Sequence, residues 1–230
     1  MLLSGGRQFA SPFGTFYAPN ISPDPENGIG GWSAMDLANA MVKGTSPDGQ
    51  HYFPAFPYTS YTKANLGDIV SLHAFLATLP ASTQPSKAHD VGFPFNIRRT
   101  LGVWKFLFLR DDFVVAGDLS EQEQRGRYLA EALGHCAECH TARNPLGGLK
   151  LSEWLGGAPN PSGKGTIPNI TPGKLLWSQA DIAEYLSSGF TPEYDTVGGS
   201  MADVVENTAK LPPEDRAAIA AYLANVVAVN

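Results

Sequence analysis

The pentapeptide Cys136-Ala137-Glu138-Cys139-His140 is the feature that most constrains this 230-residue chain, because it contains both of the chain's cysteines. A disulfide between residues three apart would close a very short loop and stabilise the fold little. A structural zinc site needs about four ligands, and the sequence has no second cysteine pair to supply them. A thioredoxin-like redox pair would need a βαβ setting, of which the sequence shows no sign.

Covalent haem attachment is the interpretation that uses all three reactive side chains of this pentapeptide. Two thiols one helical turn apart can add to the two vinyl groups of a haem, and the adjacent His140 can coordinate the iron. Upstream, Ser120 and Glu123 have the spacing of a capping box, and Gly134 is placed to end the helix before the motif. A bare dithiol or a partial metal site remains the alternative.

Met201 is the candidate for the second axial ligand, since a methionine opposite the histidine raises the reduction potential of electron carriers. It is the only methionine after the motif, and the preceding Gly198 and Gly199 allow a close approach to a flat cofactor. A helix is expected to follow over residues 213–227. The alternative role of Met201 is to fill a gap in the core. The predicted metal ligands are therefore His140 and Met201, and no nucleophile–base constellation indicates a catalytic residue.

The two halves of the chain contain parallel motifs in the same order. The pairs are Pro19-Asn20-Ile21 with Pro168-Asn169-Ile170, Trp32-Ser33 with Trp177-Ser178, and Gly44 with Gly189. Serine after tryptophan is typical of a helix N-cap, and the glycine is typical of a helix end. The repeat predicts two related units, 1–80 and 119–230, joined by a linker over 81–118. The motif that would correspond to Cys136–His140 in the first unit is expected upstream of residue 1.

Nearly the whole sequence resembles bacterial diheme cytochrome c subunits of periplasmic and membrane-bound dehydrogenases. The residues that carry the resemblance are 12–21 (PFGTFYAPNI), 54–58 (PAFPY) and 133–141 (LGHCAECHT). It implies an all-α, loop-rich fold of two tandem class I cytochrome c-like domains, the first lacking its N-terminal helix and haem motif. It also implies one haem c in this sequence and a second in a full-length protein.

The function implied by the resemblance is electron transfer from a dehydrogenase catalytic subunit to a downstream electron acceptor, without enzymatic activity of its own. The location implied is the periplasm. The printed sequence shows no secretion signal, so an N-terminal truncation is expected. A haem enzyme resembling a thiosulfate dehydrogenase or a peroxidase, with an open first-haem site, is one alternative. A haem-free remnant that only binds its partner is another.

Phe56 departs from the family pattern, because it stands where the repeat places the counterpart of Met201. Phenylalanine cannot ligate iron, and some relatives have methionine in this segment. His51 and Lys63 lie close by in the sequence and are possible substitutes.

Charge and aromatic residues bear on the partners. The net charge of −6 falls entirely on residues 118–230, and the absence of a basic stripe argues against nucleic acid. Residues 98–110 mix cations with aromatics, which suggests either a docking strip for a partner, with possible peripheral membrane association, or a linker that buries its aromatics between the units. No apolar run is long enough to cross a bilayer.

Overall fold

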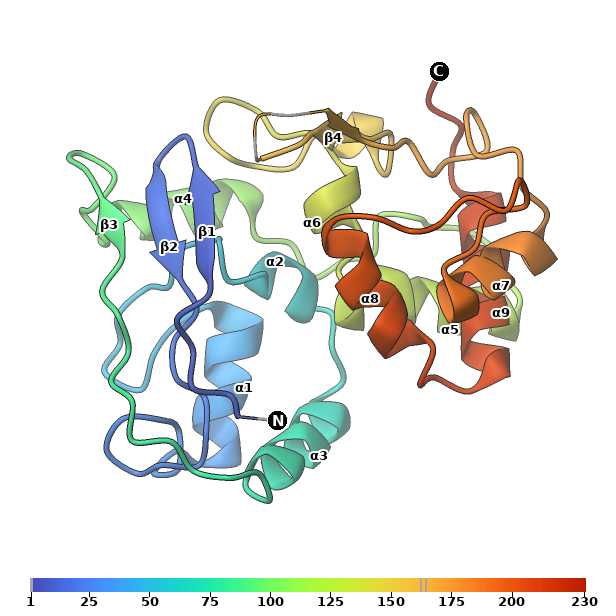
Figure 1. The fold of residues 1–230 in the computed structure, drawn as a ribbon. Helices are drawn as coiled ribbons and strands as arrows, with labels where there is room; N and C mark the ends of the chain where they lie inside the picture. Colours follow the sequence, from blue (N-terminus) through green and yellow to red (C-terminus); the bar gives the residue numbers. More distant parts are fainter. Residues whose placement is uncertain (1, 162, 164) are drawn as a thin grey trace. The chain divides into compact units, whose positions relative to one another are not determined.

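The structure, a computed structural model, describes residues 2–161, 163 and 165–230 (Figure 1). The chain divides into two compact units, Met1–Asp111 and Asp112–Asn230. Residues 81–111 of the predicted linker are therefore counted with the first unit. Each unit has its own core and is described by itself.

The first unit combines a small antiparallel sheet with short helices. Strands β1 (Gln8–Ser11) and β2 (Gly14–Tyr17) form a hairpin, and β3 (Asp90–Val91) pairs with the other edge of β2. Figure 1 shows the chain returning from α3 along this hairpin to β3. The helices are α1 (Ala34–Lys43), α2 (Tyr58–Tyr61), α3 (Leu66–Leu76) and α4 (Thr100–Phe108).

The prediction of an all-α fold is wrong. Helices contain 38% of the residues and strands contain 10%, and the strands form two small sheets. The physical reason lies in the segment from Gln8 to Tyr17. Aromatic and β-branched residues flank the turn at Pro12-Phe13, a composition that favours a hairpin. Gly14, at φ 133°, lies so close to the carbonyl of Asp90 that any side chain there would prevent β3 from pairing.

Helix α4 packs one face against the rest of the first unit, and its other face is exposed. Leu101 joins the aromatic cluster of Phe16 and Phe53. Lys105 is buried, and its Nζ donates to the carbonyl of Lys43 at 2.7 Å, where α1 ends. Phe106, in contrast, is 88% exposed. Within the first unit, residues 98–110 therefore have one packed face and one exposed face, and both the docking strip and the linker that buries its aromatics between the units stay predictions.

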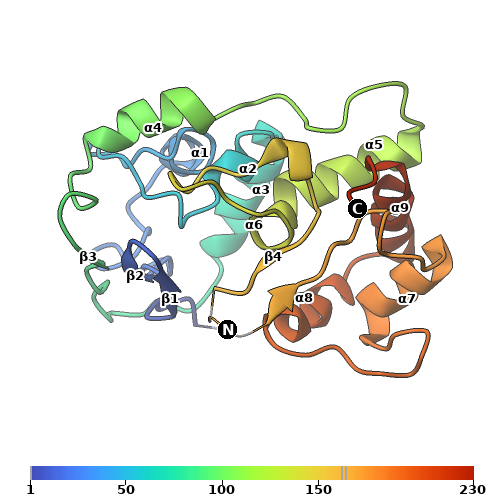
Figure 2. The same ribbon diagram turned by 90° about the horizontal axis from the view of Figure 1, so that it is seen from above.

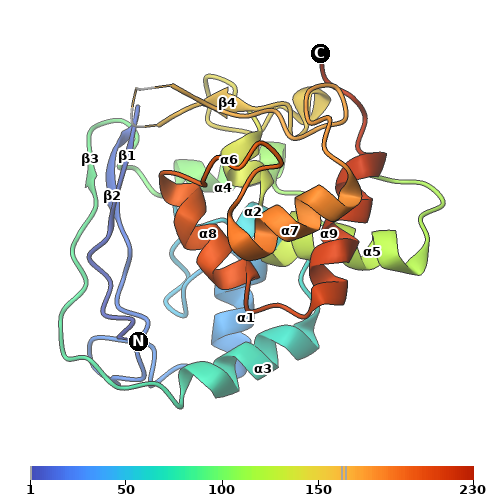
Figure 3. The same cartoon turned by 45° about the vertical axis from the view of Figure 1, so that its right-hand side comes forward.

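The second unit is mainly helical. Helix α5 (Glu121–Arg127) continues into a π-helix (Tyr128–Leu133), as the continuous ribbon in Figure 2 shows. The remaining elements are α6 (Ala137–His140), a 3₁₀ helix (Leu151–Glu153), α7 (Gln179–Ser188), α8 (Ser200–Thr208), α9 (Pro213–Asn225), and the pair β4 (Ala158–Pro159) and β5 (Thr166–Ile167). Figure 3 shows α9 against both α5 and α7, which it contacts extensively.

The crossing of α5 and α9 depends on Gly126. A β-carbon at this position would lie 1.9 Å from the carbonyl oxygen of Ala218 and 2.8 Å from the Cβ of Tyr222. The two backbones can approach this closely only because glycine has no side chain. The first and last helices of this unit therefore cross in close contact at Gly126.

Gly126→Ala is expected to destabilise the second unit by at least about 2–3 kcal/mol, because the new methyl group must force α5 and α9 apart. Urea unfolding of the exported protein measures the change. Gly67→Ala is the matched control, since a β-carbon there meets no atom within 4 Å and alanine favours helix α3. Equal stability of Gly126→Ala and the wild type would disprove the close crossing.

The two units repeat the same local structures. Ser33 and Ser178 each cap a ten-residue helix through a capping box, and Gly44 and Gly189 end these helices in the left-handed conformation. The N-caps and helix ends predicted from the sequence are thereby confirmed. The side-chain amide of Asn20 donates to Ser82 O, and that of Asn169 donates to Val229 O, so each asparagine ties its loop to a segment far along the chain.

Candidate haem site

The Cys136–His140 motif lies directly after the π-helix of the second unit. Helix α6 forms one turn over Ala137–His140, with Cys136 at its N-cap. His135 adopts φ 42°, which is uncommon for a residue with a side chain. The amide of Cys136 donates to the carbonyl of Ala130 at 3.0 Å, which anchors the motif to the π-helix. π-helical turns occur frequently at functional sites of proteins.

His140 is buried, and its hydrogen bonding defines its tautomer. Nδ1 lies 2.8 Å from the carbonyl oxygen of Pro168, which can only accept, so Nδ1 carries the proton and donates. Nε2 is then unprotonated and has a lone pair for a metal. Burial lowers the pKa of His140, which further favours the neutral ring, although the bond to Pro168 acts in the opposite direction. This is the arrangement expected of a histidine that ligates iron.

The two thiols are free, with Cys136 half-buried and Cys139 exposed. Burial raises the pKa of Cys136 to about 11. The pKa of Cys139 is also raised, first because its sulfur atom is partly enclosed although the residue as a whole is exposed, and second because the Glu138 carboxylate is near. Redox-active dithiols show the opposite shift, since their chemistry needs a thiolate. Within the part of the chain that the structure describes, no group of three or more His, Cys, Asp or Glu could hold a metal ion. The raised pKa of the thiols disfavours a redox-active dithiol.

Met201 lies in the first turn of α8. It is half-buried and packs against the same apolar cluster as Cys136. Gly199 precedes the helix at φ 59°, a conformation that favours glycine. A β-carbon at Gly198 or Gly199 would meet no atom within 4 Å, so the space beside this loop is open.

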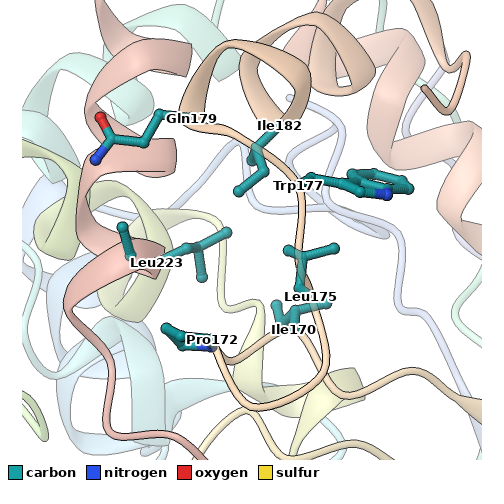
Figure 4. A pocket seen from close by; sticks show the side chains of 8 residues that line it. Ile170, Pro172, Leu175, Trp177, Gln179, Ile182 and Leu223 are labelled. Atoms are coloured by element: carbon teal, nitrogen blue, oxygen red, sulfur yellow. The ribbon is translucent and has the colours of Figure 1, made fainter.

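A small, partly open cavity of about 110 Å³, lined mostly by apolar residues, lies between α7 and α9 (Figure 4). Its lining includes Leu175, Ile182 and Leu223, which belong to or pack against the cluster that Cys136 and Met201 contact. Cofactor sites usually have about 300–1,000 Å³, so this cavity alone would not enclose a porphyrin. The fit to a haem therefore rests on the donor set: two free thiols, a histidine with a free Nε2, and a thioether packed against the same core.

The first unit does not present an equivalent set among its described residues. Phe56 packs against the rings of Tyr52 and Tyr61. Nδ1 of His51 lies 3.0 Å from Nζ of Lys105. Nζ of Lys63, in the turn after α2, donates to the carbonyl of Thr59 in that helix. Neither proposed substitute ligand is held in the way that His140 is held.

Two features of the site are not predicted by the sequence. Pro168 stands out there only as part of the repeat, whereas in the structure its carbonyl orients His140. Glu131 is the other, a buried carboxylate on the π-helix whose contacts are described below. The only sequence signal for Glu131 is a charged residue in the apolar stripe Tyr128, Leu129, Ala132 and Leu133.

Comparison with known proteins is consistent with this site. No family model matches the chain. The chain is 59% identical over 230 residues to a "Diheme cytochrome c-type" protein of Cereibacter sphaeroides, covering all of the chain and 78% of that protein. It is 36% identical over 234 residues to "Fructose dehydrogenase cytochrome subunit" of Gluconobacter japonicus, covering 98% of the chain and 48% of that protein. It is also 36% identical over 240 residues to "Alcohol dehydrogenase (quinone), cytochrome c subunit" of Gluconobacter oxydans, covering 98% of the chain and 50% of that protein.

These likenesses and the site define a c-type cytochrome, a haem protein that transfers electrons. The chain belongs to the family of diheme c-type cytochromes and cytochrome subunits of dehydrogenases. Its role is that of an electron-transfer subunit rather than a catalytic one, and its cofactor is haem c. The chain spans only about half the length of the fructose and alcohol dehydrogenase subunits. No helix within the described residues is long and apolar enough to cross a membrane.

Proposed function

We propose that this chain carries electrons from the catalytic subunit of a periplasmic dehydrogenase to a downstream acceptor. The haem would be attached at Cys136 and Cys139, with His140 and Met201 as axial ligands. The observation that carries the proposal is the buried His140, whose proton is held on Nδ1 by Pro168 beside two free thiols. The names of the relatives support a dehydrogenase as the partner.

The chain's own residues would orient and shield the haem, which supplies a one-electron redox couple when it is bound. The bond to Pro168 fixes the ring of His140 and increases its basicity as a ligand. Leu175, Ile182 and Leu223 would present apolar side chains to the haem from their side of the core. A thioether from Met201 would favour the ferrous state and raise the potential. Electron transfer requires no acid or base from the protein.

The proposal assigns one haem to this sequence, which has one CxxCH motif. For a full-length protein we propose a second haem in the first unit. Its support is the structural repeat, in which α1 and Gly44 correspond to α7 and Gly189. The proposed location is the periplasm, where haem is attached to exported chains. Peripheral membrane association through residues 98–110 remains a prediction.

Reduction by a partner tests this proposal. The chain, exported together with the haem-attachment machinery, is mixed with the catalytic subunit of a dehydrogenase from the same organism and with that enzyme's substrate. The haem absorbance should change to that of the ferrous form only when both are present. A haem that a small chemical reductant reduces but the dehydrogenase and its substrate leave oxidised would contradict the proposal.

A further inference from the structure

Glu131 is a carboxylate enclosed in the core of the second unit. It lies on the π-helix, five residues before Cys136, and only 1% of its surface is exposed. Buried carboxylates are rare unless they are paired or fully hydrogen-bonded, because removing a charge from water is costly. The partners of Glu131 therefore indicate which form of the side chain the fold accommodates.

Every hydrogen bond that the structure describes at the Glu131 carboxylate is donated to it. The amides of Val114 and Val115 donate to Oε2 at 2.7 Å and Oε1 at 3.1 Å. The indole N–H of Trp154 can only donate, and it lies 2.9 Å from the hydroxyl oxygen of Tyr222. The hydroxyl proton of Tyr222 is therefore free to point at Glu131 Oε1, 2.8 Å away. A site built of three donors suits the ionised carboxylate, which only accepts.

No cation lies within ion-pair distance of this carboxylate in the part of the chain that the structure describes. Arg127, one helical turn earlier, donates to the carbonyl of Val115 and stacks over the ring of Phe113 instead. The negative charge is therefore balanced by backbone and hydroxyl dipoles. In a core of low dielectric such a charge acts over a longer distance than it would at the surface.

The charge is close to the proposed haem-attachment segment. The residue before it, Ala130, accepts the hydrogen bond from the amide of Cys136. Tyr222 and Trp154, which complete its hydrogen-bond chain, belong to the cluster against which Cys136 and Met201 pack. The carboxylate and the proposed metal ligands thus share one apolar core.

We propose that the buried charge of Glu131 sets the reduction potential of the haem, by favouring the ferric over the ferrous state and so offsetting part of the effect of Met201. One electron enters the iron on reduction, and a fixed negative charge nearby makes that step less favourable. The proposal rests on the proposed haem site. Glu131 acts through its field and ligates nothing.

The test is potentiometric titration of the exported holoprotein carrying Glu131→Gln, which removes the charge and keeps the shape. The potential should shift to a more positive value. Glu121→Gln, an exposed glutamate on α5, is the matched control and should leave the potential unchanged. Tyr222→Phe removes a hydrogen bond from the same network but leaves the charge, so a positive shift is not expected.

Other outcomes separate the possible failures. If Glu131→Gln and Tyr222→Phe shift the potential equally and in the same direction, Glu131 has a packing role and the inference is overturned. If neither the wild type nor any variant contains covalent haem, the proposal of the haem site is contradicted. Should Glu131→Gln not fold, the infrared spectrum of the wild type at neutral pH decides. The three donors predict the band of an ionised carboxylate for Glu131, and the carbonyl band of a buried protonated carboxyl group would overturn the inference.

Discussion

Replacing both Cys136 and Cys139 with alanine is expected to abolish covalent haem attachment completely. The two free thiols are the only cysteines of the chain, so no other side chain can form the thioether bonds. Each single replacement should leave one thioether, and the haem should then be attached by one bond only. The measurement is the intact mass of the exported protein, before and after extraction with acidified acetone.

Glu138→Gln, between the two cysteines, is the control for this experiment. Glu138 forms an ion pair with Arg143 and supplies no thiol of its own, so covalent attachment should persist in this variant. Haem that remains covalently bound after both cysteines are replaced would disprove attachment at this motif. Haem that is extractable from the wild type would do the same.

Met201→Ala is expected to have the second largest effect. Loss of the thioether should lower the reduction potential and abolish the weak far-red absorption band that reports sulfur bound to ferric iron. The ferrous protein should also begin to bind carbon monoxide, because one axial position becomes open. Met35→Ala is the matched control, since Met35 lies in the first unit and is 64% exposed.

An unchanged band and potential in Met201→Ala would assign the sixth ligand to another residue. Carbon monoxide binding by the unaltered protein would favour the enzyme hypothesis over the carrier. The half-buried position of Met201 against the core that also contacts Cys136 fits either an iron ligand or a core residue, and this variant separates the two roles.

Much of the helical framework could be predicted because its signals are local. Ser33, Ser120 and Ser178 each precede a carboxylate by three residues, and all three form capping boxes. The close crossing of α5 and α9 at Gly126, in contrast, is seen only in the tertiary structure. The distance of 1.9 Å from the would-be β-carbon of Gly126 to the carbonyl oxygen of Ala218 shows why no larger residue fits there.

The sheets and the polar interior could not be predicted from local signals with the same success. β3 has only two residues, and its pairing with Gly14 depends on chain segments about 75 residues apart. The burial of Lys105 depends on the carbonyl groups that end α1, and that of Glu131 depends on Val114, Val115 and Tyr222. In each case a polar residue is stabilised by partners that only the tertiary structure brings together.

The proposed site also contains groups that the sequence reveals and groups that it does not. Cys136, Cys139 and His140 are recognisable because their chemistry requires fixed spacing. The carbonyl of Pro168, 28 residues beyond His140, has no side-chain signal at all. Groups that orient a metal ligand in this way can be backbone carbonyls, and a sequence pattern does not show where a carbonyl points.

Haem-mediated electron transfer is tested best by a redox titration of the wild-type chain, exported with the haem-attachment machinery. We expect one covalent haem per chain that takes up and releases one electron reversibly, and whose ferrous form does not bind carbon monoxide. A chain that emerges without covalent haem, or with a haem that cannot be cycled between its two oxidation states, would contradict a role as an electron carrier.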